Sequence, residues 1–474
     1  MPPPAVASIP LRPAFAVAHH EADRTTGIAA ARGWFLFAIG SLVLAGLLSL
    51  MLVVGRLPVF APLFTDPLFF KRALVVHVDL ALVVWFQAGT AAFLAWALGR
   101  KVPRAVVAAA FALGAAGLAC LVAGAAAPGA QPILANYVPV IDHPLFLAGL
   151  AGWFAAGGLF FGAALLAPAG NPRFPDGALV ALKGAAAANL VAVATFAVAW
   201  STTLAGLPPI AHYELVAWGG GHVLQVANVA TMLGLWLLLL EKWSGRPVLS
   251  PAAARWLIVA LVLPHASLPL LALGGTSAPA YAATATALMR WTIFPVVLVV
   301  LGLGLRHMGQ GRMETGDRWF DRRLAGLAGS AALTLLGFVL GALIRGSSTL
   351  VPGHYHAAIG AVTLALMTAA YDLCGAVAPA GLPAGVLSRA RLQVMLFGAG
   401  QAVFALGFAL AGASGLGRKQ YAAEQAVRTL GEYLGLGVMG LGGLVAVAGG
   451  ILFLVLMGRG VAAWRARPAT GFSP

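Results

Sequence analysis

Cysteine and charge are both scarce in this chain of 474 residues. Cys120 and Cys374 are the only cysteines, and both lie in apolar stretches. They exclude a disulfide framework, a thiolate zinc site, a Cys-x-x-Cys-His haem attachment and a two-cysteine copper centre. Only 9% of the residues are charged and 61% are hydrophobic, whereas a soluble domain carries about 25% charged residues. The composition therefore predicts a protein whose solvent is a lipid bilayer.

Acidic residues are also few, with 14 Asp and Glu against 29 Lys and Arg, which gives a formal charge of +15. The basic residues lie between apolar runs rather than along one stripe. This pattern indicates membrane orientation and predicts no nucleic-acid partner. Residues 1–30 lack the apolar core of a signal peptide, so we expect them to form an N-terminal tail.

Long apolar runs dominate the rest of the sequence. A transmembrane helix needs about 20 mostly apolar residues, and the abundant glycine (59 residues) favours close helix packing in a membrane. The predicted fold is all-α, a polytopic bundle of twelve transmembrane helices within residues 31–460. The predicted spans are 32–55, 73–98, 105–127, 144–167, 178–206, 214–240, 255–275, 281–305, 324–345, 353–374, 391–413 and 434–458.

Most Lys and Arg residues fall in segments on the side of both chain ends. Because cytoplasmic loops of membrane proteins are enriched in Lys and Arg, both ends are predicted to be cytoplasmic. An even number of spans agrees with this orientation. We therefore expect a multi-pass protein of the inner (cytoplasmic) membrane, surrounded by lipid, with cytoplasmic tails at residues 1–30 and 461–474.

Half of the ten histidines lie inside predicted spans, in the outer third to half of the membrane. An ionisable residue in hydrocarbon is a functional candidate by default, and neutral imidazole is a common metal ligand. An interhelical hydrogen bond is the alternative for each ring taken singly. These five residues are His77, His222, His265, His354 and His356.

The pair His354 and His356 carries the most geometric information. Residues two apart on an α-helix point about 200° from one another, so the two imidazoles cannot share one small ion. They can serve two planar macrocycles on opposite faces of span ten. One haem would be closed by His77 and suited to electron transfer, and the other would keep an open position. His222 and His265 could then hold a second metal over the open haem.

These motifs resemble subunit I of the haem-copper oxidase superfamily, which includes cytochrome oxidases and nitric oxide reductases. The sequence Gly353-His354-Tyr355-His356 is similar to the His-aromatic-His motif on the tenth helix of that family. The resemblance implies that His354 is the axial and catalytic ligand of a high-spin haem. It implies that His356 and His77 are the ligands of a low-spin haem.

Two further stretches carry the resemblance. Trp218-Gly219-Gly220-Gly221-His222 is similar to the Trp-x-x-Gly-His motif of helix six, which implies that His222, together with His265, binds a catalytic copper ion. The external stretch 417–421 (Gly-Arg-Lys-Gln-Tyr) resembles a basic pair that holds haem propionates. It implies that Arg418 and Lys419 have that role, and an ordinary solvated loop is the alternative.

The sequence also departs from the family. Span seven offers one histidine, His265, instead of an adjacent pair, so the third ligand of the second metal stays open among Ser267, Gln225 and water. Position 226 is Val, where similar oxygen reductases carry a tyrosine that serves O–O cleavage. The glutamates that nitric oxide reductases use are absent from the span interiors. The gaseous acceptor is therefore left open between O2 and NO.

Proton and electron supply complete the prediction. Asp79 and Glu214 are candidate proton relays; an internal hydrogen bond is the alternative for Asp79, and Glu424 is a further external acid. Because the chain has no c-type haem motif and no cysteine copper site, electrons must come from a separate donor. That donor is a cytochrome c, a cupredoxin-like subunit or a quinol.

Two other classes of protein remain as alternatives. A non-catalytic membrane protein that senses, stores or carries haem or copper would explain the incomplete histidine pair of span seven. A secondary transporter would share the count of twelve spans, and it predicts inverted repeats and broken helices near the midplane.

Overall fold

The computed structural model describes residues 14–60, 63, 67–168, 170–310, 321–419 and 425–465, with the backbone alone for 14–26 and 67. Gln420, Tyr421 and Glu424 lie outside these residues. The elements are α1 (Ala14–Arg56), α2 (Pro67–Val78), η2 (Asp79–Val84), α3 (Trp85–Leu98), η3 (Gly99–Lys101), α4 (Arg104–Ala126), β1 (Gln131–Ile133), β2 (Val140–Asp142), α5 (Pro144–Leu166), α6 (Asp176–Thr202), α7 (Pro209–Ser244), α8 (Pro251–Val262), η4 (Leu263–Ala266), α9 (Ser267–Leu273), α10 (Pro279–Gly309), α11 (Arg322–Leu343), α12 (Leu350–Ala376), α13 (Ala384–Ala413) and α14 (Leu430–Ala463).

Twelve helical stretches of the described residues are long and apolar enough to cross a membrane, and each overlaps one predicted span. The predicted fold class, an all-α bundle of twelve membrane helices, is confirmed. Several helices begin with a proline in the first turn, where the missing N–H would have no helical partner anyway. These prolines are Pro144, Pro209, Pro251 and Pro279.

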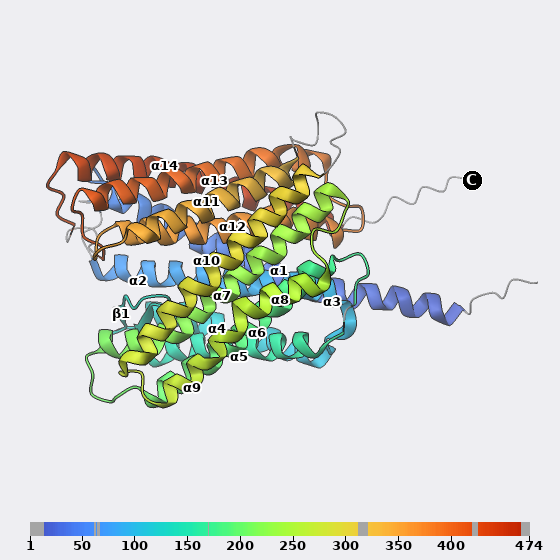
Figure 1. Cartoon of the computed structure of the whole chain (residues 1–474), viewed down its shortest axis with the longest axis horizontal. Helices are drawn as coiled ribbons and strands as arrows, with labels where there is room; N and C mark the ends of the chain where they lie inside the picture. Colours follow the sequence, from blue (N-terminus) through green and yellow to red (C-terminus); the bar gives the residue numbers. More distant parts are fainter. Residues whose placement is uncertain are drawn as a thin grey trace, which may run out of the picture.

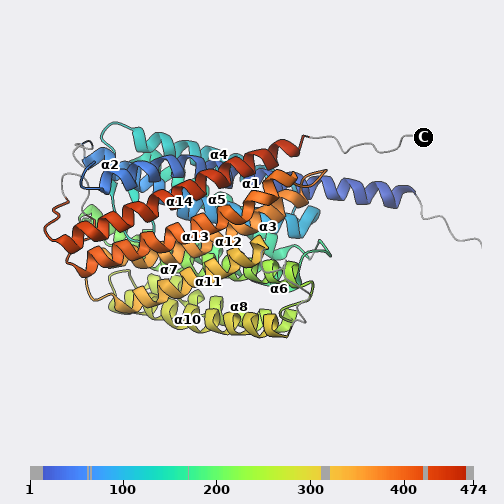
Figure 2. The same cartoon turned by 90° about the horizontal axis from the view of Figure 1, so that it is seen from above.

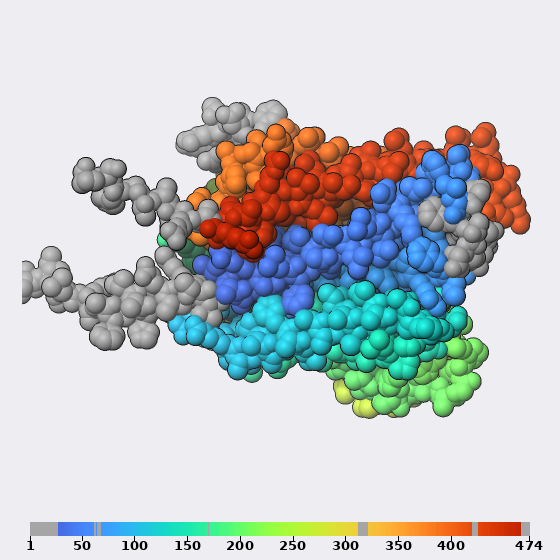
Figure 3. Space-filling view, turned by 180° about the vertical axis from the view of Figure 1, so that it is seen from behind, coloured from blue at the N-terminus to red at the C-terminus, as the bar shows by residue number. Residues whose placement is uncertain are grey.

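The helices run roughly along one common axis, and the start of α1 and the end of α14 lie at the same end of the bundle (Figures 1 and 2). The antiparallel hairpin of β1 and β2 lies at the opposite end. We call these the terminal end and the hairpin end. On the face shown in Figure 3, α1 (blue) lies between α14 (red) and the α4 and α5 region (cyan).

Glycines let neighbouring helices approach to backbone contact. A Cβ added at Gly407 of α13 would lie 2.1 Å from the Met439 nitrogen of α14, and one at Gly442 would lie 2.3 Å from the Phe404 nitrogen. A Cβ at Gly124 of α4 would lie 2.4 Å from the Phe146 nitrogen of α5. Small residues at such contacts drive helix association in membranes, so the glycine content serves the packing that the sequence predicts.

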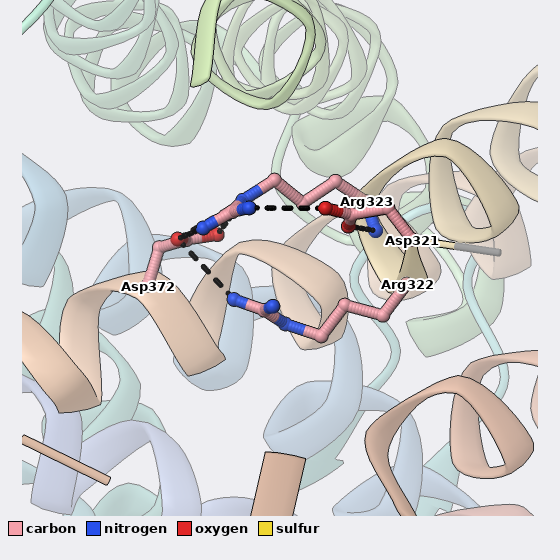
Figure 4. Close-up of polar contacts among 4 residues, drawn as sticks. All are labelled: Asp321, Arg322, Arg323 and Asp372. Atoms are coloured by element: carbon pink, nitrogen blue, oxygen red, sulfur yellow. Dashed lines mark hydrogen bonds and ion pairs between the residues drawn. The ribbon is translucent and has the colours of Figure 1, made fainter. Parts of the chain in front are cut away.

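An ion-pair network ties α11 to α12 at the terminal end (Figure 4). Arg323 Nη2 lies 2.6 Å and Arg322 Nη2 3.3 Å from Oδ1 of the nearly buried Asp372, and Arg323 Nη1 lies 3.2 Å from Asp321 Oδ2. Two guanidinium groups on one carboxylate satisfy a charge that would be costly to leave unpaired. The network fixes the register of the two helices.

Two spans contain a segment that is not α-helical. The second span changes to a π-helix at Asp79–Val84, and the seventh changes to a 3₁₀ turn at Leu263–Ala266, which includes Pro264. Such segments are often found at functional sites. One directly follows His77 and the other contains His265, so both irregularities adjoin histidines that the sequence selects.

Candidate functional site

The five selected histidines lie in the halves of their spans nearer to the hairpin end. His77, His222 and the α12 pair follow the starts of helices that begin at that end, and His265 precedes the end of the seventh span. All five histidines thus lie in the half of the bundle that the sequence predicts, at different distances from the helix ends.

His354 and His356 face different helices. The Nδ1 atom of His354 lies 2.7 Å from the Gly337 carbonyl oxygen of α11. The ring of His356 packs on α13, at 4.7 Å from the Phe404 ring and 5.6 Å from the Phe408 ring, measured between centroids. The 200° separation of the two side chains thus places them on opposite sides of α12.

His354 lies in a space that a glycine leaves open. A Cβ at Gly341, one turn after Gly337 on α11, would lie 2.7 Å from the Nδ1 atom of His354. Any larger residue at position 341 would displace the imidazole. Gly341 and the Gly337 carbonyl together fix where the ring lies.

His77 is the last residue but one of helix α2, and its Nδ1 atom lies 2.9 Å from the Ala45 carbonyl oxygen of α1. The side chains of His77 and His356 are close enough for their charges to interact, and Arg56 lies near the same pair. The two rings thus influence one another electrostatically, and the haem role that the sequence gives them stays a prediction.

His222 is almost fully buried in α7, with 1% of its surface exposed. Its Nδ1 atom lies 2.7 Å from the Trp218 carbonyl oxygen, one turn earlier. Its Nε2 atom lies 2.9 Å from the Tyr137 hydroxyl and 3.5 Å from the Thr286 hydroxyl. Because the carbonyl can only accept, Nδ1 carries the proton, and the Tyr137 hydroxyl donates to Nε2.

The three glycines before His222 each make room for an aromatic ring. A Cβ at Gly219 would lie 2.3 Å from the Tyr281 hydroxyl, one at Gly220 would lie 2.5 Å from the Phe196 ring, and one at Gly221 would lie 2.3 Å from the Tyr137 Cβ. The rings come from α10, α6 and the hairpin loop. The glycine run therefore has a packing role as well as its place in the motif.

His265 is fully buried, and neither of its ring nitrogens has a hydrogen-bond partner among the described residues. Its imidazole and that of His222 are close enough for their charges to interact. Ser267, a candidate third ligand, instead donates its hydroxyl to the Pro264 carbonyl at 2.7 Å. His265 is thus a buried polar ring whose nitrogens make no well-aligned hydrogen bond among the described residues, although the Leu261 carbonyl, one turn earlier, lies near it.

A shared pattern links three of these rings. His77, His222 and His354 each direct Nδ1 at a backbone carbonyl, so the neutral ring presents an unprotonated Nε2. Metal-binding histidines commonly hold the second ring nitrogen in this way, which fixes the tautomer and the orientation of the ring. In this tautomer Nε2 is the nitrogen that can bind a metal ion, and in His222 it accepts the hydrogen bond of the Tyr137 hydroxyl.

Acidic and basic groups cover the site at the hairpin end. Glu214 accepts hydrogen bonds from the Asn136 backbone nitrogen at 2.9 Å and from the Asn136 side chain. Burial raises the pKa of Tyr137, Glu214 raises it further, and Arg418 acts against this change. Burial lowers the pKa of Lys419, an effect that Glu214 opposes. The predicted propionate pair and the predicted relay Glu214 are therefore neighbours.

Backbone strain marks the same place. Tyr137 (φ 68°) and Lys419 (φ 64°) are the two non-glycine residues with positive φ within the described ranges. Such left-handed conformations cost free energy in residues with a side chain, and they cluster at functional sites. Arg418 fixes its segment through Ser347, to whose hydroxyl its Nε atom donates at 3.1 Å.

Asp79 is completely buried, and neither carboxylate oxygen has a hydrogen-bond partner among the described residues. The internal hydrogen bond that the sequence offers as an alternative role for Asp79 is therefore not formed with any described residue. Arg290, which lies within the predicted eighth span, is exposed on the outer surface of α10. It lines a cavity of about 420 Å³ together with Trp218, Thr286 and Trp291.

Four of the five histidines form two pairs, His77 with His356 and His222 with His265, and His354 lies apart against α11. Across the described part of the chain, no group of three or more His, Cys, Asp or Glu side chains is placed to hold a metal ion. Tyr137 is the contact of His222 that sequence reasoning missed. The two residues are 85 positions apart, and no motif in the sequence connects them.

Comparisons with known proteins extend this description. No protein-family model matches the chain. An uncharacterized protein of Aquifex aeolicus (strain VF5) is 29% identical over 339 residues, covering 70% of this chain and 82% of that protein. Uncharacterized protein RP382 of Rickettsia prowazekii (strain Madrid E) is 23% identical over 519 residues, covering 93% and 97%.

Among solved structures, the chain is similar to a haem-copper terminal oxidase dimer determined by cryo-electron microscopy. The TM-score is 0.67 with 14% sequence identity, and the alignment covers 94% of this chain and 84% of the oxidase chain. At this identity the likeness establishes a shared fold. The twelve-helix arrangement is therefore that of a haem-copper oxidase chain.

Proposed function

We propose that this chain is an integral-membrane oxidoreductase that binds two haems and a second metal and reduces a small gaseous acceptor, O2 or NO. His77 and His356 would hold the low-spin haem, His354 the high-spin haem, and His222 with His265 the second metal, most simply copper. When bound, these groups supply electron transfer, an open iron position and a Lewis acid beside it.

One observation carries the proposal. Three of the five histidines, on three different spans, direct Nδ1 at a carbonyl and present an unprotonated Nε2. The Nδ1 contacts of His77 and His354 are hydrogen bonds to neighbouring helices, and they leave Nε2 of each ring unprotonated, which is the arrangement common among metal-binding histidines. Two further observations agree with the proposal. The ring nitrogens of His265 have no hydrogen-bond partner among the described residues, as expected for a metal ligand, and Gly341 leaves the space in which the His354 ring lies.

The residues around the histidines have supporting roles in this proposal. Arg418 and Lys419, on the hairpin side of α12, would pair with haem propionates. Glu214, next to Lys419, would pass protons from the outside, and Asp79, whose carboxyl group is buried without a partner, would exchange a proton beside the low-spin haem. Electrons would come from a separate cytochrome c, cupredoxin-like subunit or quinol.

The membrane orientation belongs to the same proposal. The described structure places the start of α1 and the end of α14 at one end of the bundle. The distribution of Lys and Arg assigns that end to the cytoplasm of the inner membrane. The candidate site would then face the periplasm, where an external electron donor can dock.

Optical spectra test the haem assignments. The purified protein is expected to bind about two haem irons per chain and to show a bis-histidine signal on reduction, while carbon monoxide shifts the second haem. His356→Ala should abolish the low-spin signal and leave the carbon monoxide shift in place. His212→Ala, at the first turn of α7, is the matched control and should change neither signal. A protein purified without haem would overturn the proposal.

A second function is favoured by one specific observation. Because no cluster of three or more His, Cys, Asp or Glu side chains appears in the described residues, a non-catalytic haem or copper carrier is the next candidate. The haem-loaded protein and a chemical electron donor would be assayed for consumption of O2 and of NO. Consumption of either gas supports the reductase, and none of either, with both haems in place, supports the carrier.

A further inference from the structure

The hairpin loop reaches down to the candidate second-metal site through one side chain. Tyr137 lies between β1 and β2, and its hydroxyl is 2.9 Å from the Nε2 atom of His222. The Tyr137 and His222 ring centroids are 4.4 Å apart, and the Trp218 ring lies 5.9 Å from that of Tyr137. The loop therefore contributes directly to the surroundings of a deeply buried imidazole.

Only one nitrogen of His222 can take a metal ion. Nδ1 is occupied by the Trp218 carbonyl at 2.7 Å, so a metal can bind at Nε2 alone. Two protein oxygens face Nε2, and Thr286 is the poorer donor because it lies 3.5 Å away and already donates to the Ala282 carbonyl at 3.0 Å. The nearest oxygen to any metal at this nitrogen is the hydroxyl of Tyr137.

The loop is built to hold Tyr137 in this position. Glu214 accepts two hydrogen bonds from Asn136, the preceding residue. Tyr137 itself has a left-handed backbone conformation, with φ 68°, and its Cβ fits the notch that Gly221 leaves open. A strained backbone conformation persists only where the surroundings impose it, and here the result is a hydroxyl group aimed at a metal-binding nitrogen.

We infer that Tyr137 is the third protein ligand of the second metal, completing with His222 and His265 a site of two imidazole nitrogens and one phenolate oxygen. This inference rests on the proposed function, which leaves the third ligand open. Nitrogen and oxygen donors suit Cu²⁺, and tyrosine is an established iron ligand. On binding, the Oη–H bond of Tyr137 breaks, the metal–oxygen bond forms and the proton leaves to bulk water.

Copper binding to the haem-loaded protein tests the inference. Copper would be removed with a chelator, Cu²⁺ added back, and affinity measured by chelator competition. Tyr137→Phe keeps the ring and is expected to weaken Cu²⁺ binding by about 10–100-fold, the range for loss of a supporting group, or by more. Tyr281→Phe is the matched control, because the Tyr281 hydroxyl contacts the Gly219 backbone nitrogen at 3.1 Å, and it should bind Cu²⁺ as the wild type does.

The direction in which Tyr137→Phe changes the Cu²⁺ affinity shows whether Tyr137 binds the metal or only covers Nε2 of His222. If Tyr137 only covers Nε2, its removal frees that nitrogen, and Tyr137→Phe would bind Cu²⁺ equally well or more tightly, which overturns the inference. His222→Ala should lose the copper that the wild type binds. If the wild type binds no copper, or if His222→Ala binds it equally well, there is no copper site at His222 and this inference fails as well. The two haem spectra remain a separate test of the proposed function.

A second measurement needs no variant, in case Tyr137→Phe does not accumulate. Resonance Raman spectra of copper-loaded wild-type protein would be compared between ordinary and ring-deuterated tyrosine. Haem bands cancel in the difference spectrum, because only tyrosine is labelled. Copper-dependent phenolate bands that shift with the label support Tyr137 as a ligand, and their absence contradicts it.

Discussion

At Gly341, the lack of a side chain decides where an imidazole can lie. The ring of His354 occupies the space beside this glycine, with Nδ1 at 2.7 Å from the Gly337 carbonyl and at 2.7 Å from where a Cβ on Gly341 would be. Interiors are packed closely enough that one added methyl group is felt. The position of His354 is thus set from the neighbouring helix.

Gly341→Ala should displace His354 and impair the high-spin haem. Overpacking of this kind costs about 1–3 kcal/mol, and we expect a reduced carbon monoxide shift with an unchanged low-spin signal from His77 and His356. Gly40→Ala is the control, since a Cβ there meets nothing within 4 Å. Equal carbon monoxide shifts in both variants would show that His354 does not hold that haem.

The sequence predicts some of these residues and not others, for a physical reason. The opposite faces of His354 and His356 follow from helix geometry alone, because both rings belong to one helix. The contact between Tyr137 and His222 depends on a loop that returns to a distant helix, and no local pattern encodes such a return. The unpartnered carboxyl group of Asp79 likewise becomes visible only when its neighbours are in place.

Among the helices, α13 and α14 approach each other through glycines on both partners. A Cβ added at Gly442 would lie 2.3 Å from the Phe404 nitrogen, whereas a Cβ added at Gly437 on the same helix would meet no atom within 4 Å. The two positions differ in packing and share the same helix. They offer a matched pair for testing how much the glycine contact stabilises the bundle.

Gly442→Leu is expected to separate α13 from α14 and destabilise the protein by about 1–3 kcal/mol or more. Gly437→Leu should leave stability close to that of the wild type. The loss of folded protein on heating in detergent, followed by size-exclusion chromatography, measures both. Similar curves for the two variants would contradict the packing role of Gly442.

Helix content was predictable, while helix irregularity was predictable only in part. Apolar runs of sufficient length locate all twelve spans, because hydrocarbon requires continuous backbone hydrogen bonding. Pro264 signals the 3₁₀ turn at His265, since proline removes a backbone donor. The π-helix at Asp79–Val84 contains no proline or glycine, and it arises from packing that the sequence does not display locally.

For the molecule as a whole, orientation is the property that most constrains the proposed chemistry. The candidate histidines lie toward the hairpin end, and the start of α1 and the end of α14 lie at the other. If the terminal end is cytoplasmic, an electron donor must dock from the periplasm. The opposite orientation would require a cytoplasmic donor.

Reporter fusions test this orientation in cells. A fluorescent protein fused after Pro474 should fold and fluoresce, because it would stay in the cytoplasm. Alkaline phosphatase fused after Leu57, between the first two spans, should be active, because it would be exported. Phosphatase activity at the C-terminus would contradict the predicted orientation and reverse the side of the donor.

The three glycines of α7 also set an order of assembly. Their aromatic neighbours, Tyr137, Phe196 and Tyr281, come from the hairpin loop, α6 and α10. As the ribosome delivers the chain, α7 enters the bilayer before the last of these rings has been synthesised. The enclosure around His222 therefore closes only after α10 is inserted and Tyr281 packs against Gly219.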